Sequence, residues 1–170
     1  MGFPNVTPAW YNRPMKKGND MKPTIYFDLD GTLYDLYGQP AWLDRLHASD
    51  PSAYAADALM VDADAFHATL DNLVAAGYAI GVITWLARGA SQEYKTATRR
   101  VKKAWIHKHL PHATEIHMVA YGTPKHRIAK NRPAILVDDN AEVREAWTLG
   151  ATIDATQDLV AALQSLATAQ

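Results

Sequence analysis

Short apolar runs alternate along the chain with stretches whose apolar residues recur at helical spacing. The runs are rich in β-branched and aromatic residues, which predicts strands. They lie at residues 25–27, 78–84, 115–120, 134–138 and 151–154. Continuous apolar runs are typical of strands buried on both faces. The pattern therefore predicts an α/β fold, a three-layer, Rossmann-like, doubly wound parallel sheet covered by helices on both sides.

The stretches between the predicted strands have the spacing of amphipathic helices. One helix is predicted between Asp62, a cap residue, and Gly77, a stop signal. Its apolar face is expected to contain Phe66, Leu70, Leu73 and Val74. Three more helices are expected, a long one from about Ala90 to near Pro111, one between Asn140 and Gly150, and one striped by Leu159, Leu163 and Leu166.

Two segments lie outside this alternation. Residues 1–22 contain three prolines and two glycines without an apolar period, and we interpret them as a flexible N-terminal arm. Residues 35–61 carry turn signals at Gly38, Pro40 and Pro51 and predict two short helices, near 41–48 and 52–59. We expect residues 23–170 to form one domain that carries 35–61 as a small helical insertion.

The composition excludes some classes of chemistry and partner but does not indicate a particular function. The 170 residues are 48% hydrophobic and 21% charged, with a net charge of -1, so nucleic acid is not favoured as an obligate partner. The absence of cysteine excludes disulfides, thiolate catalysis and cysteine-bound zinc. No apolar run has the length of a membrane span, and we expect a cytoplasmic protein without membrane contact.

Polar residues follow three of the predicted strands at the point where each strand ends. Asp28 and Asp30 follow the first, Thr84 ends the second, and Asp138 and Asp139 follow the apolar part of the fourth. The ligand site of a doubly wound sheet lies beyond the carboxyl ends of its strands, so these side chains should converge. Neighbouring carboxylates repel each other, and a divalent cation or protonation of one acid relieves the repulsion.

Four segments in this order resemble the four motifs of the haloacid dehalogenase (HAD) superfamily of phosphotransferases, over about residues 24–166. They are Asp28-Leu-Asp30-Gly-Thr32, Thr84 after Gly-Val-Ile, Lys125 in Thr-Pro-Lys-His, and Asp138-Asp139 after Ile-Leu-Val. The resemblance implies that residues 35–61 form a small cap over the site and that the protein is a HAD-type phosphatase, a phosphoric monoester hydrolase.

The resemblance also implies a role for each position. Asp28 would be the nucleophile that forms an aspartyl phosphate, and Asp30 would be the general acid and base. Thr84 would donate a hydrogen bond to the phosphoryl group, and Lys125 would neutralise charge on the phosphoryl group and on the nucleophile. Mg²⁺ would be held by Asp28, the backbone carbonyl of Asp30, Asp138 and Asp139.

The expected partner is a small phosphorylated substrate. The segment from Lys102 to Leu110 loosely resembles the 5'-nucleotidase and deoxyribonucleotidase branch, which suggests 5'-nucleotides. Thr32 and Trp85, with Arg88 nearby, are the expected substrate contacts, Trp85 by stacking on a base. Two alternatives stay open, a phosphatase of polynucleotide ends and a non-catalytic protein that binds a phosphate ligand.

Other charged residues carry less weight. His107, His109 and His112 do not share one helical face, and we expect surface residues rather than a metal site. The lysines and arginines between Arg88 and Lys108 are interpreted mainly as a solvated face that could also steer anionic substrates. Lys130 is a weaker candidate for the role of Lys125.

Overall fold

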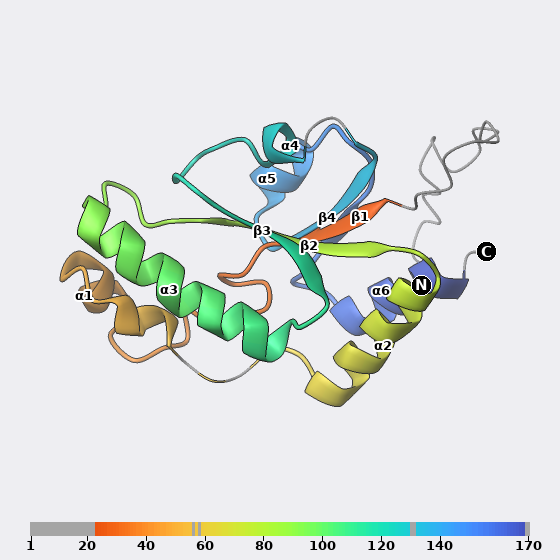
Figure 1. Cartoon of the computed structure of the whole chain (residues 1–170), viewed down its shortest axis with the longest axis horizontal. Coiled ribbons are helices and arrows are strands. Elements are labelled where there is room, and N and C mark those ends of the chain that lie inside the picture. Colours follow the sequence, from red (N-terminus) through yellow and green to blue (C-terminus); the bar gives the residue numbers. More distant parts are fainter. Residues whose placement is uncertain (1–22, 56, 58, 130–131, 169–170) are drawn as a thin grey trace.

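The computed structural model describes residues 23–55, 57, 59–129 and 132–168 (Figure 1). The predicted N-terminal arm and Lys130 lie outside these residues. No helix in the described ranges is long and apolar enough to cross a membrane.

Five parallel strands form one sheet, as the apolar runs predicted. They are β1 (Thr24–Phe27), β2 (Ala79–Trp85), β3 (Ala113–Val119), β4 (Ala134–Asp138) and β5 (Thr152–Asp154), in the order β3-β2-β1-β4-β5. The chain therefore builds outward from β1 on one side and then, from β4, on the other. This reversal between β1 and β4 is the switch point at which doubly wound sheets bind ligands.

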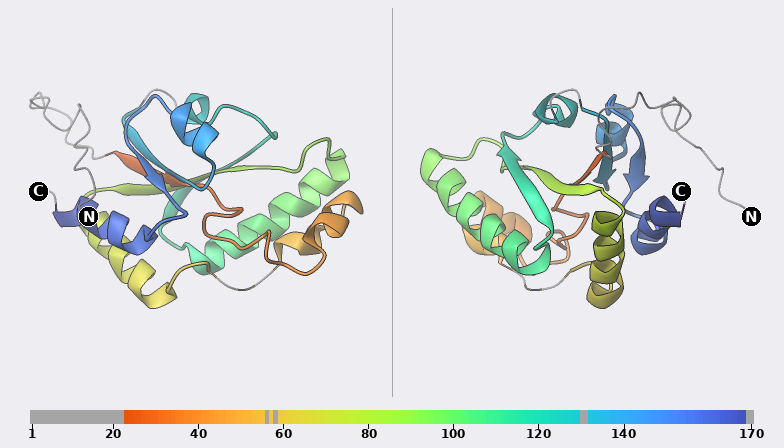
Figure 2. Two further views of the ribbon diagram at one scale, coloured as in Figure 1. Left: turned by 180° about the vertical axis from the view of Figure 1, so that it is seen from behind. Right: turned by 45° about the vertical axis from the view of Figure 1, so that its right-hand side comes forward.

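Helices cover both faces of the sheet and make the predicted three layers (Figures 1 and 2). The longer helices α2 (Ala63–Ala75), α3 (Gln92–His109) and α6 (Leu159–Thr168) lie on one face. The short helices α4 (Lys125–Ile128) and α5 (Ala141–Glu145) lie on the other. Phe27 packs edge-on against Phe66 in the larger core, whereas Tyr26 packs against Trp147 in the smaller one.

The insertion between β1 and α2 contains the helix α1 (Trp42–His47) and the 3₁₀-helix η1 (Pro51–Tyr54). Asp50 caps η1 by accepting a hydrogen bond from the backbone N–H of Ser52. The hydroxyl of Tyr34 donates to the carbonyl of Ala53 at 2.5 Å, which fastens the insertion to the turn after β1. The two short helices were predicted, although the second is shorter than expected.

Three details of the predicted helices were wrong. Val74 is 45% exposed, whereas Phe66, Leu70 and Leu73 of the predicted apolar face are completely buried. The helix after Asn140 ends at Glu145, well before Gly150, and the chain then turns so that the buried Trp147 donates to the carbonyl of Ala134. The buried face of α3 contains Tyr94, Thr98, Lys102, Trp105 and Ile106, so Lys102 does not belong to the solvated face that was expected for the lysines and arginines of this segment.

Candidate functional site

Carboxylates gather at the switch point of the sheet. Asp28 directly follows β1 and Asp138 ends the neighbouring strand β4, and the N–H of Asp28 donates to the carbonyl of Val137 at 2.9 Å. One carboxylate oxygen from each of Asp28, Asp138 and Asp139 lies within 4.8 Å of the others. Within the described ranges, this is the only such group of three acidic or histidine side chains. The predicted convergence of the strand ends is therefore confirmed for these acids.

Lys125 lies among the carboxylates and is 4% exposed. Its Nζ donates to Asp28 Oδ1 at 2.6 Å and to Asp138 Oδ2 at 2.7 Å. Burial by itself would lower the pKa of Lys125, but these two carboxylates raise it above its ordinary value, so the ammonium stays charged. Lys125 is the first residue of α4, and Pro124 occupies the cap position before it.

The remaining charge of the acids is only partly compensated. Burial, followed by the neighbouring charge of Asp28, raises the pKa of Asp138 to about 6, although Lys125 opposes the change. Burial and Asp28 also raise the pKa of Asp139. An additional positive charge at this place would relieve the repulsion, and oxygen ligands of this kind suit Mg²⁺.

Asp139 is held by the loop that follows β1. Thr32 is 1% exposed and does not line the cavity; its Oγ1 donates to Asp139 Oδ1 at 3.2 Å and accepts from the N–H of Asp139 at 3.1 Å. A direct substrate contact by Thr32 stays a prediction that this geometry does not favour. Gly31 has a φ of +80°, and a Cβ there would lie 2.6 Å from Asp139 Oδ2. The loop can approach Asp139 this closely only because residue 31 has no side chain.

Asp30 has a partner that sequence reasoning missed. Its Oδ2 accepts a hydrogen bond of 2.6 Å from Nζ of Lys102, a side chain that is 2% exposed. Burial raises the pKa of Asp30, and Lys102 opposes the change. The interpretation of Lys102 as part of a solvated basic face was therefore wrong. The spacing of Tyr94, Thr98 and Lys102 at intervals of four was the available signal, because it places Lys102 on a mainly uncharged helical face.

Thr84 is completely buried near the same lysine. Its Oγ1 accepts a hydrogen bond from Lys102 at 3.0 Å, and the residue is not part of the cavity wall. A hydrogen bond from Thr84 to a phosphoryl group stays a prediction.

A cavity of about 440 Å³ opens above the acids and has two pairs of aromatic residues in its wall. Tyr37 and Trp42 come from the insertion, with ring centroids 5.2 Å apart. Trp85 ends β2 and Tyr121 follows β3, with ring centroids 5.0 Å apart. The expected positions Trp85 and Arg88 both line this cavity, and the Arg88 guanidinium lies 5.7 Å from the centre of the Tyr121 ring.

Besides the acids and Lys125, sequence reasoning identified Trp85 and Arg88 in this wall but not the aromatic residues Tyr37, Trp42 and Tyr121. Tyr37 and Tyr121, which are more than half exposed, stand in loops without a periodic signal. Only the fold brings these loops to one cavity.

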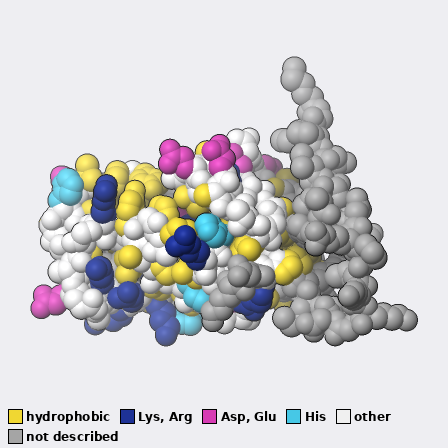
Figure 3. Space-filling view, turned by 90° about the horizontal axis from the view of Figure 1, so that it is seen from above, with side chains coloured by type: hydrophobic (Ala, Val, Ile, Leu, Met, Phe, Trp, Pro, Cys, Tyr) yellow, Lys and Arg dark blue, Asp and Glu magenta, His cyan; other side chains and the backbone are white. Residues whose placement is uncertain are grey.

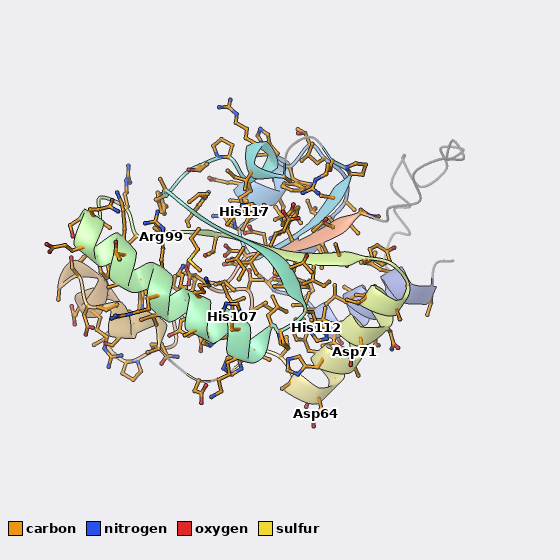
Figure 4. All side chains as sticks on the ribbon, in the orientation of Figure 1. Asp64, Asp71, Arg99, His107, His112 and His117 are labelled. Atoms are coloured by element: carbon orange, nitrogen blue, oxygen red, sulfur yellow. The ribbon has the colours of Figure 1, made fainter. Side chains whose placement is uncertain are left out.

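The histidines near the end of α3 have separate surroundings. Nε2 of His109 lies 3.0 Å from an oxygen of Asp57, and Nε2 of His112 lies 2.8 Å from Oδ1 of Asp71. Figure 4 shows His107 on α3 and His112 beside Asp71 of α2. The expectation of separate surface residues is confirmed for His107, which is exposed, whereas His109 and His112 are partly buried.

The basic face of α3 is smaller than the sequence suggested, because Lys102 points inward. Arg99, Arg100, Lys103 and Lys108 are exposed, and Lys and Arg side chains gather along the side of the molecule on which α3 lies (Figure 3). This face lies outside the cavity wall and is available for solvent or for an anionic partner.

Fold and site together define a doubly wound α/β protein with a buried centre of carboxylates and lysines at the switch point. No family model matches the sequence, and no curated protein matches it. One similar solved structure is described as a "putative had-like phosphatase" from Mesorhizobium loti. It shares 14% sequence identity, the match covers 91% of each chain, and the TM-score is 0.44. A likeness this distant carries no argument about function, which has to be argued from the site.

Proposed function

We propose that this protein is a Mg²⁺-dependent phosphomonoester hydrolase of the HAD type that acts through an aspartyl phosphate, with 5'-nucleotides as the substrate class. The observation that carries the proposal is the contact between Asp28 and the buried Lys125 beside Asp138, at the floor of a cavity of about 440 Å³. A nucleophilic carboxylate beside a fixed positive charge is suited to attack on an anionic phosphoryl group.

The acids fit Mg²⁺ by their chemistry. Asp28, Asp138 and Asp139 offer oxygen ligands alone, at distances from one another that one ion can span. Burial, and after it the charge of Asp28, raises the pKa of Asp138 and of Asp139, and a cation would oppose the second of these causes. The predicted fourth ligand is the backbone carbonyl of Asp30. When bound, Mg²⁺ would neutralise charge on the transferring phosphoryl group.

In the first step, a carboxylate oxygen of Asp28 forms a bond to phosphorus as the bond between phosphorus and the ester oxygen breaks. The leaving oxygen takes a proton from the carboxyl group of Asp30, so that an alcohol departs. Lys125 faces the nucleophile and stabilises negative charge on the phosphoryl oxygens.

In the second step, Asp30 removes a proton from a water molecule that attacks the aspartyl phosphate. Phosphate leaves and the carboxylate of Asp28 is restored. Asp30 and Asp28 line the same cavity, which supports a role of Asp30 in both proton transfers.

The aromatic wall supports a substrate with a planar leaving group. The pair of Tyr37 and Trp42 and the pair of Trp85 and Tyr121 both line the cavity and offer rings on which a nucleobase would stack. Arg88 adds positive charge near Tyr121. For this reason we favour nucleotides over small sugar or glycerol phosphates.

The test is release of phosphate from nitrophenyl phosphate and from 5'-nucleotides, with and without Mg²⁺. We expect Mg²⁺-dependent turnover that falls at least about 1,000-fold in Asp28→Asn. Asp64→Asn, an exposed acid at the start of α2 (Figure 4), is the matched control and should retain activity. Equal turnover in Asp28→Asn and in the parent protein would rule out the proposal.

The exposed basic residues of α3 favour polynucleotide ends as a second substrate class. Preference for phosphate-ended oligonucleotides over mononucleotides, with binding that weakens as salt increases, would establish that class instead. Absence of turnover together with phosphate binding would identify the non-catalytic alternative.

A further inference from the structure

Lys102 is buried, and the roles proposed for the four motifs give it no function. It comes from the middle of α3 and reaches the acid that follows β1, 72 residues earlier in the chain. We propose that Lys102 is the positioning residue of Asp30, which holds the Asp30 carboxyl group where it can exchange a proton with the leaving oxygen. This inference rests on the proposed phosphatase function.

All three hydrogens of the Lys102 ammonium have an acceptor. Nζ donates to Asp30 Oδ2 at 2.6 Å, to the carbonyl of Trp85 at 2.8 Å and to Thr84 Oγ1 at 3.0 Å. The last two acceptors belong to β2, which is hydrogen-bonded to β1 in the sheet. Lys102 therefore connects the Asp30 carboxyl group to a strand of the sheet, and the three acceptors hold its Nζ in one position.

The insertion closes over the same lysine. The ring of Tyr54, in η1, lies with its centre 4.6 Å from the Lys102 Nζ, a distance suited to a cation–π contact. A cavity of only about 10 Å³, lined by Asp30, Tyr54, Lys102 and Trp105 among others, lies beside this contact. The tight packing keeps Lys102 from swinging into solvent, which a long lysine side chain otherwise does.

A positioning role and a purely structural role make different predictions about the reaction. A displaced general acid slows departure of a poor leaving group, whereas a good leaving group needs little help from a proton. Loss of Lys102 should therefore affect a nucleoside 5'-phosphate, whose alkoxide leaves poorly, far more than nitrophenyl phosphate, whose phenolate leaves well. A damaged fold would lower the rates on both substrates to the same extent.

The experiment compares Lys102→Met with Lys103→Met, the adjacent lysine of the same helix, which is exposed. The measured quantity is kcat/KM, because it reports the steps up to cleavage of the ester bond. We expect Lys102→Met to lose about 100-fold on a 5'-nucleotide and less than about 10-fold on nitrophenyl phosphate. Lys103→Met should leave both values unchanged. If Lys102→Met does not fold, Lys102→Gln, which keeps a hydrogen-bond donor, replaces it.

A double-variant cycle tests whether Lys102 acts through Asp30. In the Asp30→Asn background, the added Lys102→Met change should cost less than about 3-fold, because the group that Lys102 positions is already inactive. Equal losses on both substrates, or a full further loss in the Asp30→Asn background, would overturn the proposal.

A crystal structure of Lys102→Met provides a readout that does not need activity. We expect the Asp30 side chain to leave its position while Asp28 and Asp138 keep theirs. An unmoved Asp30 carboxylate would overturn the positioning role even in an active enzyme. If the parent protein hydrolyses no phosphate ester, the proposed function fails, and the position of Asp30 still decides whether Lys102 holds it.

Discussion

Each of the two acids that follow β1 has its own buried lysine. Lys125 binds Asp28 and Asp138, and Lys102 binds Asp30. Asp28 and Asp30 would point the same way in a continuing strand, but the strand ends at Phe27 and the two side chains reach different partners. The two positive charges separate the environments of the acids, which is what two carboxylates with different chemical roles require.

Lys125→Met removes a positive charge that lies between two buried carboxylates. We expect it to lower the free energy of unfolding of the metal-free protein by about 3–5 kcal/mol, because an uncompensated buried charge is left behind. Mg²⁺ should restore part of this loss. Thermal or denaturant unfolding, with and without Mg²⁺, measures both effects.

The matched control is Lys108→Met. Lys108 pairs with Asp57 at 2.6 Å, but both side chains are more than 60% exposed. Exposed pairs contribute less than about 1 kcal/mol, so this change should hardly alter unfolding. Similar losses in the two variants would contradict the role given to Lys125.

At the scale of elements, short connections bring the functional side chains together. The loop after β1 carries Asp30, Gly31 and Thr32, and two hydrogen bonds of Thr32 join it to Asp139 after β4. The helix α3 adds Lys102 from a face that otherwise belongs to the core. The insertion contributes Tyr37 and Trp42 to the cavity wall and Tyr54 to the contact with Lys102.

Gly31→Ala tests the close approach of this loop to Asp139. An added Cβ would lie 2.6 Å from Asp139 Oδ2 and 2.7 Å from the Tyr37 ring, so we expect the loop and Asp139 to be displaced. Mg²⁺ affinity, measured by calorimetry, should fall at least about 10-fold.

Gly122→Ala separates this steric effect from backbone strain. Gly122 has a similar φ of +78°, but a Cβ there would meet nothing within 4 Å. It should therefore show only the strain of a left-handed alanine, about 1 kcal/mol, with Mg²⁺ affinity unchanged. Equal Mg²⁺ affinity in both variants would show that the contact with Asp139 does not matter.

At the scale of the whole molecule, the doubly wound order places β1 beside β4 and so concentrates negative charge at one edge of the sheet. Burying these neighbouring carboxylates lowers the stability of the folded protein, and the size of this loss depends on pH. The pKa of Asp138 is raised to about 6 in the folded protein, so the folded state binds this proton more tightly than the unfolded chain does.

The contribution of Asp138 to stability is therefore complete below about pH 4 and is lost as the pH rises through about 6. We expect the Tm of Asp138→Asn to rise relative to the Tm of the metal-free parent protein as the pH increases from 4 to 7. Mg²⁺ should stabilise the parent protein at pH 7 and less below pH 6, where protons compete for the same oxygen. A Tm difference that does not change across this range would contradict the assignment.

The sequence by itself determined the α/β class, the positions of the strands and the acids at their ends. It could do so because apolar runs, turn residues and caps are local, and because parallel strands bring their carboxyl ends to one edge. The pairing of Lys125 with Asp28 was also accessible, since Lys125 stands in a recognisable motif before β4.

The tertiary structure alone decided which polar side chains face the cavity. Thr32 and Thr84 are buried beneath it, and Lys102 looked like a member of a basic surface until packing placed it beside Asp30. Burial of a lysine depends on the elements that pack around it from distant parts of the chain. Local sequence carries little information about those contacts. The spacing of Tyr94, Thr98 and Lys102 indicated the helical face of Lys102, but its contact with Asp30 could be assigned only from the fold.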